Sequence, residues 1–415
     1  MNATRDALLA CYRQALIPLH GRQRVNAFLT HHAVGDHHPP QYIVAVGKAA
    51  AEMAMGAVDF YGEHIRAGLV ITKRGYLSKD NALPEIIECH EAAHPLPDES
   101  SLAAGVRLTQ FVEQLPSDSH LLFLLSGGAS SLVECLQPGI SPVQLHQMNQ
   151  WLLASGWDIA HINRLRIGIS QIKGGGLLRK VASRQVTQLM MSDVQGDDSA
   201  VIGSGLLSGR RSPLGEDVIA ALPVWIQKCL HALPTRTQAS NQVLTKLQSH
   251  IICNNAFALD VLAGLCAKHW SKVILHEESL FMDVTQAAES IVNTLINSES
   301  DTVLLWGGET TVVLPENAGA GGRNQHLALL VAQRLHVLKQ GYFLAGATDG
   351  SDGNTLYSGA IVDANTVMRA SQKGQMNIKT AINMVAATDY LLKSDDLITT
   401  GPTGSNVMDV MIAVK

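Results

Sequence analysis

The chain has 415 residues, of which 46% are hydrophobic and 16% charged, which is an ordinary globular composition. A chain of this length is expected to fold into two domains, because single hydrophobic cores stop growing at about 250–300 residues. The formal net charge of -5 and the scattered basic residues exclude the positive field that nucleic-acid binding needs. No apolar run reaches the roughly 18 residues that a transmembrane helix needs, so no membrane partner is predicted.

The N-terminal segment MNATRDALLACYRQAL predicts an amphipathic helix, because apolar residues such as Leu8, Tyr12 and Leu16 recur on one face. Charged residues come early and no cleavage site follows an apolar core, so a signal peptide is not predicted. The six cysteines are dispersed and form no CxxC pair. This usage indicates a reduced, cytoplasmic protein.

Seven apolar, β-rich runs are predicted to be strands, and glycine stands at the end of many of them. They cover residues 42–47, 68–72, 121–128, 186–193, 273–276, 302–308 and 342–350. Helix-like stretches separate many of these runs, which predicts a mostly parallel sheet covered on both faces. Ligands of such sheets bind beyond the carboxyl ends of the strands, so the glycine-rich ends are the candidate sites. A weak strand signal over 208–250 places a domain boundary near residue 240.

Two of these ends lie in the first half of the chain. In VAVGKAAAEMAMGA, Lys48 stands at a predicted helix start, where free backbone N–H groups favour an anion; the alternative is a surface lysine beside a tight turn. Neither a Walker A loop nor G-x-G-x-x-G is present there. In LLFLLSGGASSL, residues 126–131 combine glycines that let the backbone wrap an anion with serine hydroxyls. A plain strand-to-helix turn is the alternative for this segment.

Two further segments in this half carry charge. ISQIKGGGLLRK predicts a flexible loop with basic groups at Lys173 and Arg179. In MMSDVQGDD, three carboxylates occur within six residues, the first of which is Asp193. Oxygen ligands of this kind suit Mg²⁺, although aspartates also form turns and helix caps.

In the second half, Glu309 follows a strand and a Gly-Gly bend, and GAGGRNQHLALL opens a helix at Arg323 and Asn324. Positive charge is unfavourable at a helix N-terminus, so the position of this arginine indicates an anionic partner. ATDGSDGN places Asp349 and Asp352 after another strand. The calcium-loop pattern fails there, and the carboxylates suit a Mg²⁺–phosphate site or a polar substrate. TTGPTGSNVMDVMIAV predicts a glycine-proline turn and a final strand.

Ten segments together carry a resemblance to one family. They are AVGKAAAEMA, HPLPDES, LLSGGASSL, KGGGLLR, SDVQGDD with IGSG, GGETTV, GGRNQHLAL, ATDGSDGN, GAIVD and TGPTGSNVMD, from about residue 42 to 409. In this order the sequence resembles the glycerate 2-kinases that carry a MOFRL C-terminal domain, some of which have been described as hydroxypyruvate reductases. The chain departs from the family with GGASS in place of GGGSA. It also has DGSDGNTLYSG in place of DGTDGPTDAAG, which puts the acceptor preference in question.

The resemblance implies phosphorylation of D-glycerate on its 2-hydroxyl with ATP and Mg²⁺. It also implies two α/β domains with the active site in the cleft between them: a Rossmann-like three-layer domain (1–240) and a C-terminal MOFRL-type domain with a mixed sheet (241–415). In the family, the residues matching Lys48 and Arg323 are central to catalysis. Phosphoryl transfer is performed mostly by positioning and charge neutralisation, which these residue types supply.

Residue chemistry and resemblance together give a site prediction. Lys48, Arg323 and Asp193 are predicted to be catalytic, and Asp193 and Asp349 to bind Mg²⁺. The predicted cofactor-binding residues are Ser126, Gly127, Gly128, Ser130, Lys173, Gly174, Glu309 and Asn324. The partners expected are small-molecule substrates, and a homodimer is one alternative for the oligomeric state.

Two other functions are weighed against the kinase. A reductase would need G-x-G-x-x-G with an acidic residue about 20 positions on. The closest match is Gly203-Ser204-Gly205, whose third glycine falls one place late at position 209. A non-catalytic binding protein on the same fold is the second alternative, because the 349–360 loop departs from the family pattern.

Overall fold

The computed structural model describes residues 3–32, 39–77, 82–157, 159–181, 184–208, 214–233, 246–374 and 377–415. The chain forms two compact units: a middle unit of residues 21–252, and a terminal unit that joins residues 1–20 to residues 253–415. The boundary expected near residue 240 falls outside the described residues and stays a prediction. Within the described part of the chain, no helix combines the length and apolar character that crossing a bilayer requires.

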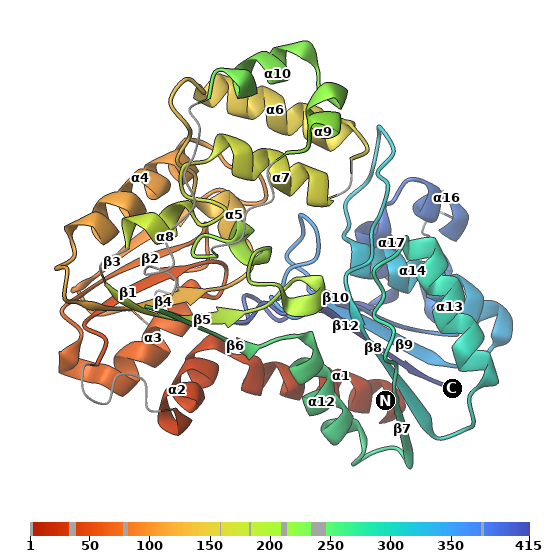
Figure 1. The fold of residues 1–415 in the computed structure, drawn as a ribbon. Coiled ribbons are helices and arrows are strands. Elements are labelled where there is room, and N and C mark those ends of the chain that lie inside the picture. Colours follow the sequence, from red (N-terminus) through yellow and green to blue (C-terminus); the bar gives the residue numbers. More distant parts are fainter. Residues whose placement is uncertain are drawn as a thin grey trace. The chain divides into compact units, whose positions relative to one another are not determined.

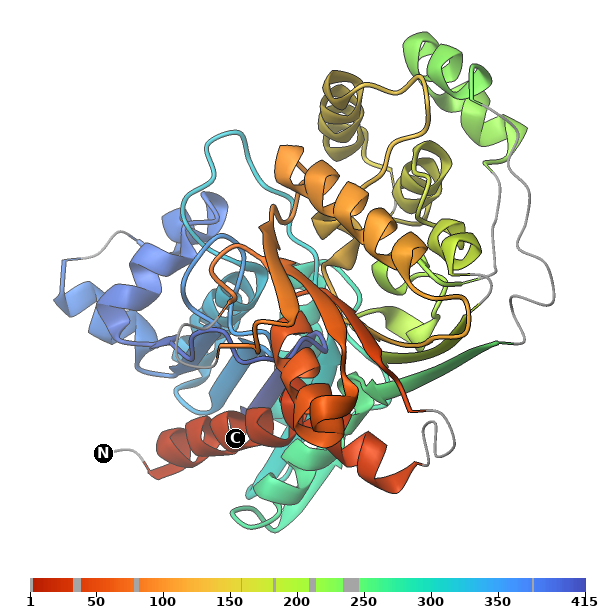
Figure 2. The ribbon, with the colours of Figure 1, turned by 90° about the vertical axis from the view of Figure 1, so that its left-hand side faces the viewer.

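The middle unit is built on a six-stranded sheet (Figures 1 and 2). Its spatial order is β3 (Ile87–Ala92), β2 (Ala67–Lys73), β1 (Tyr42–Val46), β4 (His120–Leu125), β5 (Gln185–Met191) and β6 (Leu247–Cys253). The four pairings from β3 to β5 are parallel. Every residue of β4 is buried, as expected for a strand covered by helices on both faces.

Helices of the middle unit cover both faces of this sheet. In Figure 1, α3 lies on one side, and α4, α5 and α8 lie on the other. A separate helical cluster has its own core around Met148, Leu165 and Ile226. The helices are α2 (Gly21–His31), α3 (Ala50–Tyr61), η1 (Gly62–His64), α4 (Glu99–Gln114), α5 (Ala129–Leu132), α6 (Pro142–Ala154), α7 (Ile159–Ile169), α8 (Gly176–Lys180), η2 (Gln195–Asp197), η3 (Ile202–Ser204), α9 (Glu216–Ala221) and α10 (Val224–His231).

The terminal unit contains a second six-stranded sheet, which is mixed. Its spatial order is β11 (Leu397–Ile398), β10 (Gly359–Asp363), β9 (Tyr342–Ala347), β12 (Asp409–Val414), β8 (Thr302–Gly308) and β7 (Lys272–Leu275). Among the described strand pairings of this second sheet, only β7–β8 is parallel, and the others are antiparallel. The two-sheet α/β architecture confirms the predicted fold class.

Helices α13 and α14 bury their apolar faces against one side of this sheet, in a core that includes Ile291, Leu327, Trp306 and Phe343. The N-terminal helix packs on α12 and β9 in the same unit. The helices are α1 (Ala3–Leu19), α12 (Asn255–Cys266), α13 (Val284–Asn297), α14 (Arg323–Leu338), α15 (Thr366–Gln372), α16 (Ile378–Asn383) and α17 (Ala387–Ser394). The predicted amphipathic N-terminal helix is therefore present, and it contributes to the core of the unit formed mainly by the C-terminal half.

Candidate active site

The turn after β1 brings Lys48 beside the glycine loop after β4. Gly47 has a φ of +134°, and a Cβ there would fall 2.1 Å from Ser126 Oγ, so only glycine fits. The backbone N–H of Lys48 donates to the carbonyl of Gly127 at 2.9 Å. Helix α3 begins at Ala50, which places Lys48 just before the helix start and leaves its side chain half-buried.

The loop after β4 and the short helix α5 that follows it contain four of the predicted ligand residues, at positions 126, 127, 128 and 130. Ser126 Oγ accepts a hydrogen bond from the N–H of Ala49 at 3.0 Å, which ties this loop to the β1 turn. Gly128 has a φ of +85° and caps the four-residue helix α5. A Cβ at Gly128 would lie 3.0 Å from His94 Cδ2 and 3.2 Å from Lys48 Cγ. Lys48, Gly128 and His94 therefore meet in one place, beyond the carboxyl ends of β1, β4 and β3.

A third loop contacts the segment after β4 through Ser204. The hydroxyls of Ser130 and Ser204 are 2.7 Å apart. The N–H groups of Gly174 and Gly175 donate to the carbonyls of Ser204 and Gly205 at 2.9 and 2.7 Å. The glycines of the KGGG segment thus donate to protein carbonyls. Through Ser204, this segment supports residues 126–131, which we call the serine loop.

Lys173 forms an ion pair in the interior of the middle unit. Its Nζ lies 2.6 Å from Glu134 Oε2, and both side chains are only 1% exposed. The other carboxylate oxygen of Glu134 accepts the N–H of Cys135 at 2.9 Å. A burial this deep requires a paired charge, so contact between Lys173 and a nucleotide would require this ion pair to open.

In the acidic segment after β5, Asp198 and Asp193 lie in different surroundings. Asp198 accepts the N–H of Ala200 at 2.9 Å and forms the local turn that was the alternative to a metal site. Asp193 is half-buried and follows the last residues of β5, on the same sheet edge as the β1 and β4 loops. Gly203-Ser204-Gly205 lies in and after the 3₁₀ turn η3, which differs from the strand–turn–helix context of a dinucleotide fingerprint.

In the terminal unit, Arg323 is the first residue of α14, as predicted, and carboxylates hold its guanidinium. Nε and Nη2 donate to the two carboxylate oxygens of Asp409 at 2.6 and 3.1 Å, and Nη1 donates to Glu309 at 2.5 Å. Burial would lower the pKa of Arg323, but Asp409 and Glu309 outweigh it and raise the pKa. The side chain is 33% exposed. The anionic partner expected for this arginine is therefore present within the protein itself.

Asp352 supplies the N-terminal cap of α14. Its Oδ1 accepts the N–H of Asn324 at 3.1 Å, and its Oδ2 accepts the N–H of Gln325 at 2.8 Å. Gly322 is required here, because a Cβ would fall 2.2 Å from Asp352 Cγ. Burial and the nearby Asp409 raise the pKa of Asp352 to about 6, against the effect of these hydrogen bonds. Asn324 is fully buried, and its side-chain amide also lies against Asp352.

Asp349 follows β9 in a turn that is fixed from several sides. Its Oδ1 accepts the N–H of Ser351 at 2.9 Å, and the side chain is almost fully buried. Gly350 has a φ of +87°, and a Cβ there would fall 1.9 Å from the carbonyl oxygen of Gly401. The hydroxyl of Ser405 donates to the carbonyl of Thr348 at 2.6 Å, so the TGPTGS turn packs beside the aspartate turn.

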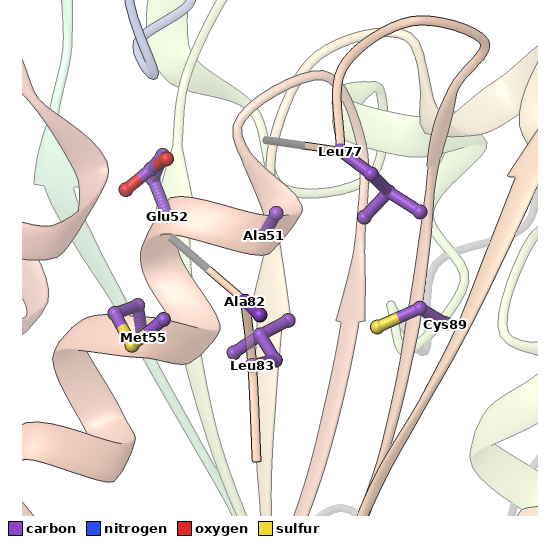
Figure 3. A pocket seen from close by; sticks show the side chains of 7 residues that line it. All are labelled: Ala51, Glu52, Met55, Leu77, Ala82, Leu83 and Cys89. Carbon is purple, nitrogen blue, oxygen red and sulfur yellow. The ribbon is translucent and has the colours of Figure 1, made fainter. Parts of the chain in front are cut away.

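A small cavity in the middle unit is a poor phosphate site. It has a volume of about 210 Å³ and lies between α3 and β3. Figure 3 shows the aliphatic side chains of Leu77, Leu83 and Met55 around it, with Glu52 as the charged residue of its lining. The described lining contains neither Lys48 nor the serine loop. Its apolar walls and its acidic group do not suit an anion.

Several residues of these clusters were not predicted as site residues. Asp409 is the first residue of β12 and is fully buried, and it holds Arg323 with two hydrogen bonds. A signal existed, because an aspartate that opens a continuous apolar strand needs a buried partner. His94 and Glu134 gave no comparable signal, because chain order alone does not show that they lie beside Gly128 and Lys173.

These features define a class of protein: a two-unit α/β chain with interlocked glycine loops at the strand ends of one unit and a carboxylate-held arginine at a helix start in the other. The sequence matches the family described as "Domain of unknown function (DUF4147)" over residues 7–225, and the MOFRL family over residues 302–409. The chain therefore belongs to the family that combines these two regions.

Curated relatives and a solved structure agree with this assignment. A D-glycerate 2-kinase of Thermotoga maritima is 34% identical over 90% of each chain. A protein of Agrobacterium vitis that carries a hydroxypyruvate reductase name is 29% identical over 89% of this chain and 97% of its own. The crystal structure of a Thermotoga maritima glycerate kinase superimposes with a TM-score of 0.81 at 29% identity and covers 99% of both chains.

Proposed function

We propose that this protein transfers the γ-phosphoryl group of ATP to the 2-hydroxyl of D-glycerate, giving 2-phosphoglycerate and ADP. The 34% identity to a D-glycerate 2-kinase over 90% of both chains carries the choice of reaction and substrate. The site geometry supports it, because glycine loops, hydroxyls and two cationic groups are what charge neutralisation in phosphoryl transfer needs.

In this proposal Lys48 contacts the transferring phosphoryl group. The lysine lies where the β1 turn, the serine loop and His94 meet, and it is the cationic group of that cluster on the predicted edge of the sheet. Ser126, Gly127, Gly128 and Ser130 bind phosphate oxygens beside it, through the backbone N–H groups and the hydroxyls of their loop. Gly174 holds that loop through Ser204, and its neighbour Lys173 would contribute from the buried pair with Glu134.

Arg323 binds the carboxylate of glycerate or the γ-phosphoryl oxygens in the same proposal. Its planar fork is fixed by Asp409 and Glu309, which removes much of the rotamer entropy that binding would otherwise cost. A third of the side chain is exposed, so an anion has access to it. Asn324 contributes indirectly by its contact with Asp352 at the start of α14.

The carboxylates of this site suit Mg²⁺ only as an ion that is bound jointly by the protein and the phosphates of ATP. No cluster of three or more His, Cys, Asp or Glu side chains suited to a metal occurs in the described part of the chain. Mg²⁺ commonly takes one or two carboxylates and completes its shell with phosphate oxygens and water. Asp193 and Asp349 each present a carboxylate at a strand end, and either would hold the ion together with ATP. The bound ion would neutralise phosphate charge.

We place the enzyme in the cytoplasm, and the six cysteines without disulfides support this. The hydroxypyruvate reductase alternative has no comparable support, because Gly203-Ser204-Gly205 lies in a 3₁₀ turn. In the described residues, no glycine motif of the dinucleotide type joins a strand to a helix.

The test is to incubate the purified protein with ATP, Mg²⁺ and D-glycerate and to couple the product to enolase without phosphoglycerate mutase. Enolase accepts 2-phosphoglycerate directly, so the signal identifies the phosphorylated hydroxyl. Lys48→Ala and Arg323→Ala are each expected to lower kcat/KM by at least about 100-fold, the usual effect of losing one charge-stabilising donor.

Matched controls are Lys272→Ala and Arg334→Ala, which remove exposed cations that pair weakly with surface glutamates. Both controls should keep wild-type kinetics. Wild-type protein that produces no 2-phosphoglycerate, yet reduces hydroxypyruvate with a nicotinamide cofactor, would overturn the kinase in favour of the reductase. Binding of ATP without turnover would favour the non-catalytic alternative.

A further inference from the structure

Tyr12 of the N-terminal helix lies buried near the charged cluster of the terminal unit. This cluster consists of Arg323, Glu309, Asp349, Asp352 and Asp409. Its side chain is fully inaccessible to solvent, and its hydroxyl donates to the carbonyl of Ala347 at 2.7 Å. The ring lies close against β9: a Cβ at Gly346 would fall 2.7 Å from two of its ring carbons. Glycine at position 346 thus makes room for this tyrosine, which comes from more than 330 residues away in sequence.

The residue whose carbonyl Tyr12 holds lies opposite the aspartate that binds the arginine. Ala347 is the last residue of β9, and it pairs with Asp409 in the antiparallel register of β9 and β12. Asp409 in turn holds Arg323 through two hydrogen bonds. Asp349 stands two residues beyond Ala347. A displacement of the β9 end would therefore be passed to Asp409, and from there to the guanidinium.

The phenol is also suited to this place electrostatically. Burial raises the pKa of Tyr12, and the carboxylates of Asp349, Asp409 and Asp352 raise it further, against a hydrogen bond with Ser358. The hydroxyl therefore stays protonated and remains a donor. A neutral donor adds no charge to this group of carboxylates.

The helix that carries Tyr12 is fastened to the same unit at its other end. The guanidinium of Arg5 donates to the carbonyls of Ile361 and Asp395 at 2.9 and 3.0 Å and lies 2.8 Å from Asp396. Leu8, Leu16 and Leu19 are buried along the helix. Tyr12 is therefore held at a fixed depth under the sheet.

We propose that Tyr12 is a positioning residue for the Arg323–Asp409 pair, so that the N-terminal helix is part of the catalytic apparatus of the terminal unit. This inference rests on the role proposed for Arg323. The inference assigns a function to the N-terminal helix, which is more than 300 residues from Arg323 in the sequence. Tyr12 lies inside the region that matches DUF4147.

Tyr12→Phe removes the hydroxyl and keeps the ring. We expect kcat to fall about tenfold, which corresponds to about 1.4 kcal/mol, with a smaller change in the KM for ATP. The matched control is Tyr390→Phe, because Tyr390 is equally buried in the same unit but lies on α17, outside the path from Ala347 to Arg323. This control should keep the wild-type kcat.

A second measurement separates positioning from general stability. In an Arg323→Lys background, which keeps the charge but loses the bidentate fork, Tyr12→Phe should have no further effect on kcat, because its effect acts through the arginine. An additional tenfold loss in that background would show that the two residues act independently and would overturn the proposal. An unchanged kcat of Tyr12→Phe alone would overturn it as well.

Hydrogen exchange tests the structural step without reference to activity. Faster amide exchange is expected in peptides covering 342–352 and 405–411 of Tyr12→Phe, but not of Tyr390→Phe. If wild-type protein does not phosphorylate glycerate, the proposed function fails while faster exchange still supports the positioning of Asp409. Unchanged exchange in both peptides overturns the positioning inference, whatever the activity.

Discussion

The middle and terminal units hold their candidate site residues by different means. In the middle unit, loops are joined to one another mainly through backbone groups and hydroxyls: Gly127 to Lys48, Ser126 to Ala49, and Gly174 to Ser204. In the terminal unit, side-chain charges do this work, with Arg323 between Asp409 and Glu309, and Asp352 at the helix cap.

Contacts between loops account for the glycines at the strand ends of the middle unit. Backbone hydrogen bonds between loops need close approach, and a Cβ at Gly47 would collide with Ser126. Such loops are specified sterically and are insensitive to pH. The charged cluster of the terminal unit contains several buried carboxylates around Arg323. Its geometry therefore depends on charge and on the protonation of those carboxylates. Variants that alter charge should therefore act differently in the two units.

The one deeply buried ion pair described in the middle unit offers the strongest test. Glu134→Gln leaves the Lys173 ammonium, 1% exposed, without the carboxylate at 2.6 Å. Removing one partner of a buried pair typically costs about 3–5 kcal/mol, so we expect a large fall in the midpoint of guanidinium unfolding. The matched control is Glu113→Gln, which breaks the exposed pair with Lys180 and should cost less than about 1 kcal/mol.

The double variant Glu134→Leu/Lys173→Met sharpens this test, because replacing a whole buried pair with apolar side chains is often neutral. Restored stability together with a wild-type KM for ATP would assign Lys173 to support of the loops. Restored stability with a strongly raised KM would instead assign it to nucleotide binding. Equal costs for Glu134→Gln and Glu113→Gln would contradict the burial argument.

The terminal unit is predicted to show a pH dependence that arises from Asp352. Its pKa of about 6 lies above that of an exposed aspartate, so the folded state binds more protons than the unfolded state between about pH 4 and 6. This carboxylate therefore makes stability fall as the pH rises through that window, by at most about 1.4 kcal/mol per pH unit.

Asp352→Asn should remove this component, apart from a constant offset for the altered cap. The difference in thermal midpoint between wild type and variant is measured from pH 4 to 7 and should change in favour of the variant as the pH rises. Asp260→Asn, on the exposed face of α12, is the control and should follow the wild type. Parallel curves for Asp352→Asn and wild type would disprove the raised pKa.

Sequence patterns predicted eight of the described strands but missed β3, β6, β10 and β11. All seven predicted runs form strands, whereas β3 was missed because its IECHEA sequence is half polar, and the four residues between its buried ends are half-buried or exposed at the sheet edge. The two-residue β11 is too short to give a pattern. The start of α14 at Arg323 was predicted correctly, because a glycine loop leads directly into a periodic apolar segment.

Partnerships between distant residues could not be predicted from patterns. Position 323 showed that the arginine needed an anion, but not that Asp409 would supply it from 86 residues away. The pairing of Lys173 with Glu134 could not be predicted either, because nothing in the KGGG sequence indicates that the lysine is buried. The attachment of α1 to the terminal unit depends on Tyr12 fitting against Gly346, which is a matter of shape that neither segment reveals alone.

The smallest effect is expected where two loops of the middle unit share one hydroxyl contact. Ser204→Ala removes the 2.7 Å bond to Ser130, while the backbone hydrogen bond that Gly174 donates to the carbonyl of Ser204 remains. We expect a loss of about 1 kcal/mol in stability and a severalfold higher KM for ATP, because the serine loop keeps its backbone shape but loses one lateral support. Ser130→Ala should give the same stability change, and the double variant should be no worse than either single one. Additive losses would mean that the two hydroxyls act through separate partners, and the interlocked-loop description of this unit would then be wrong.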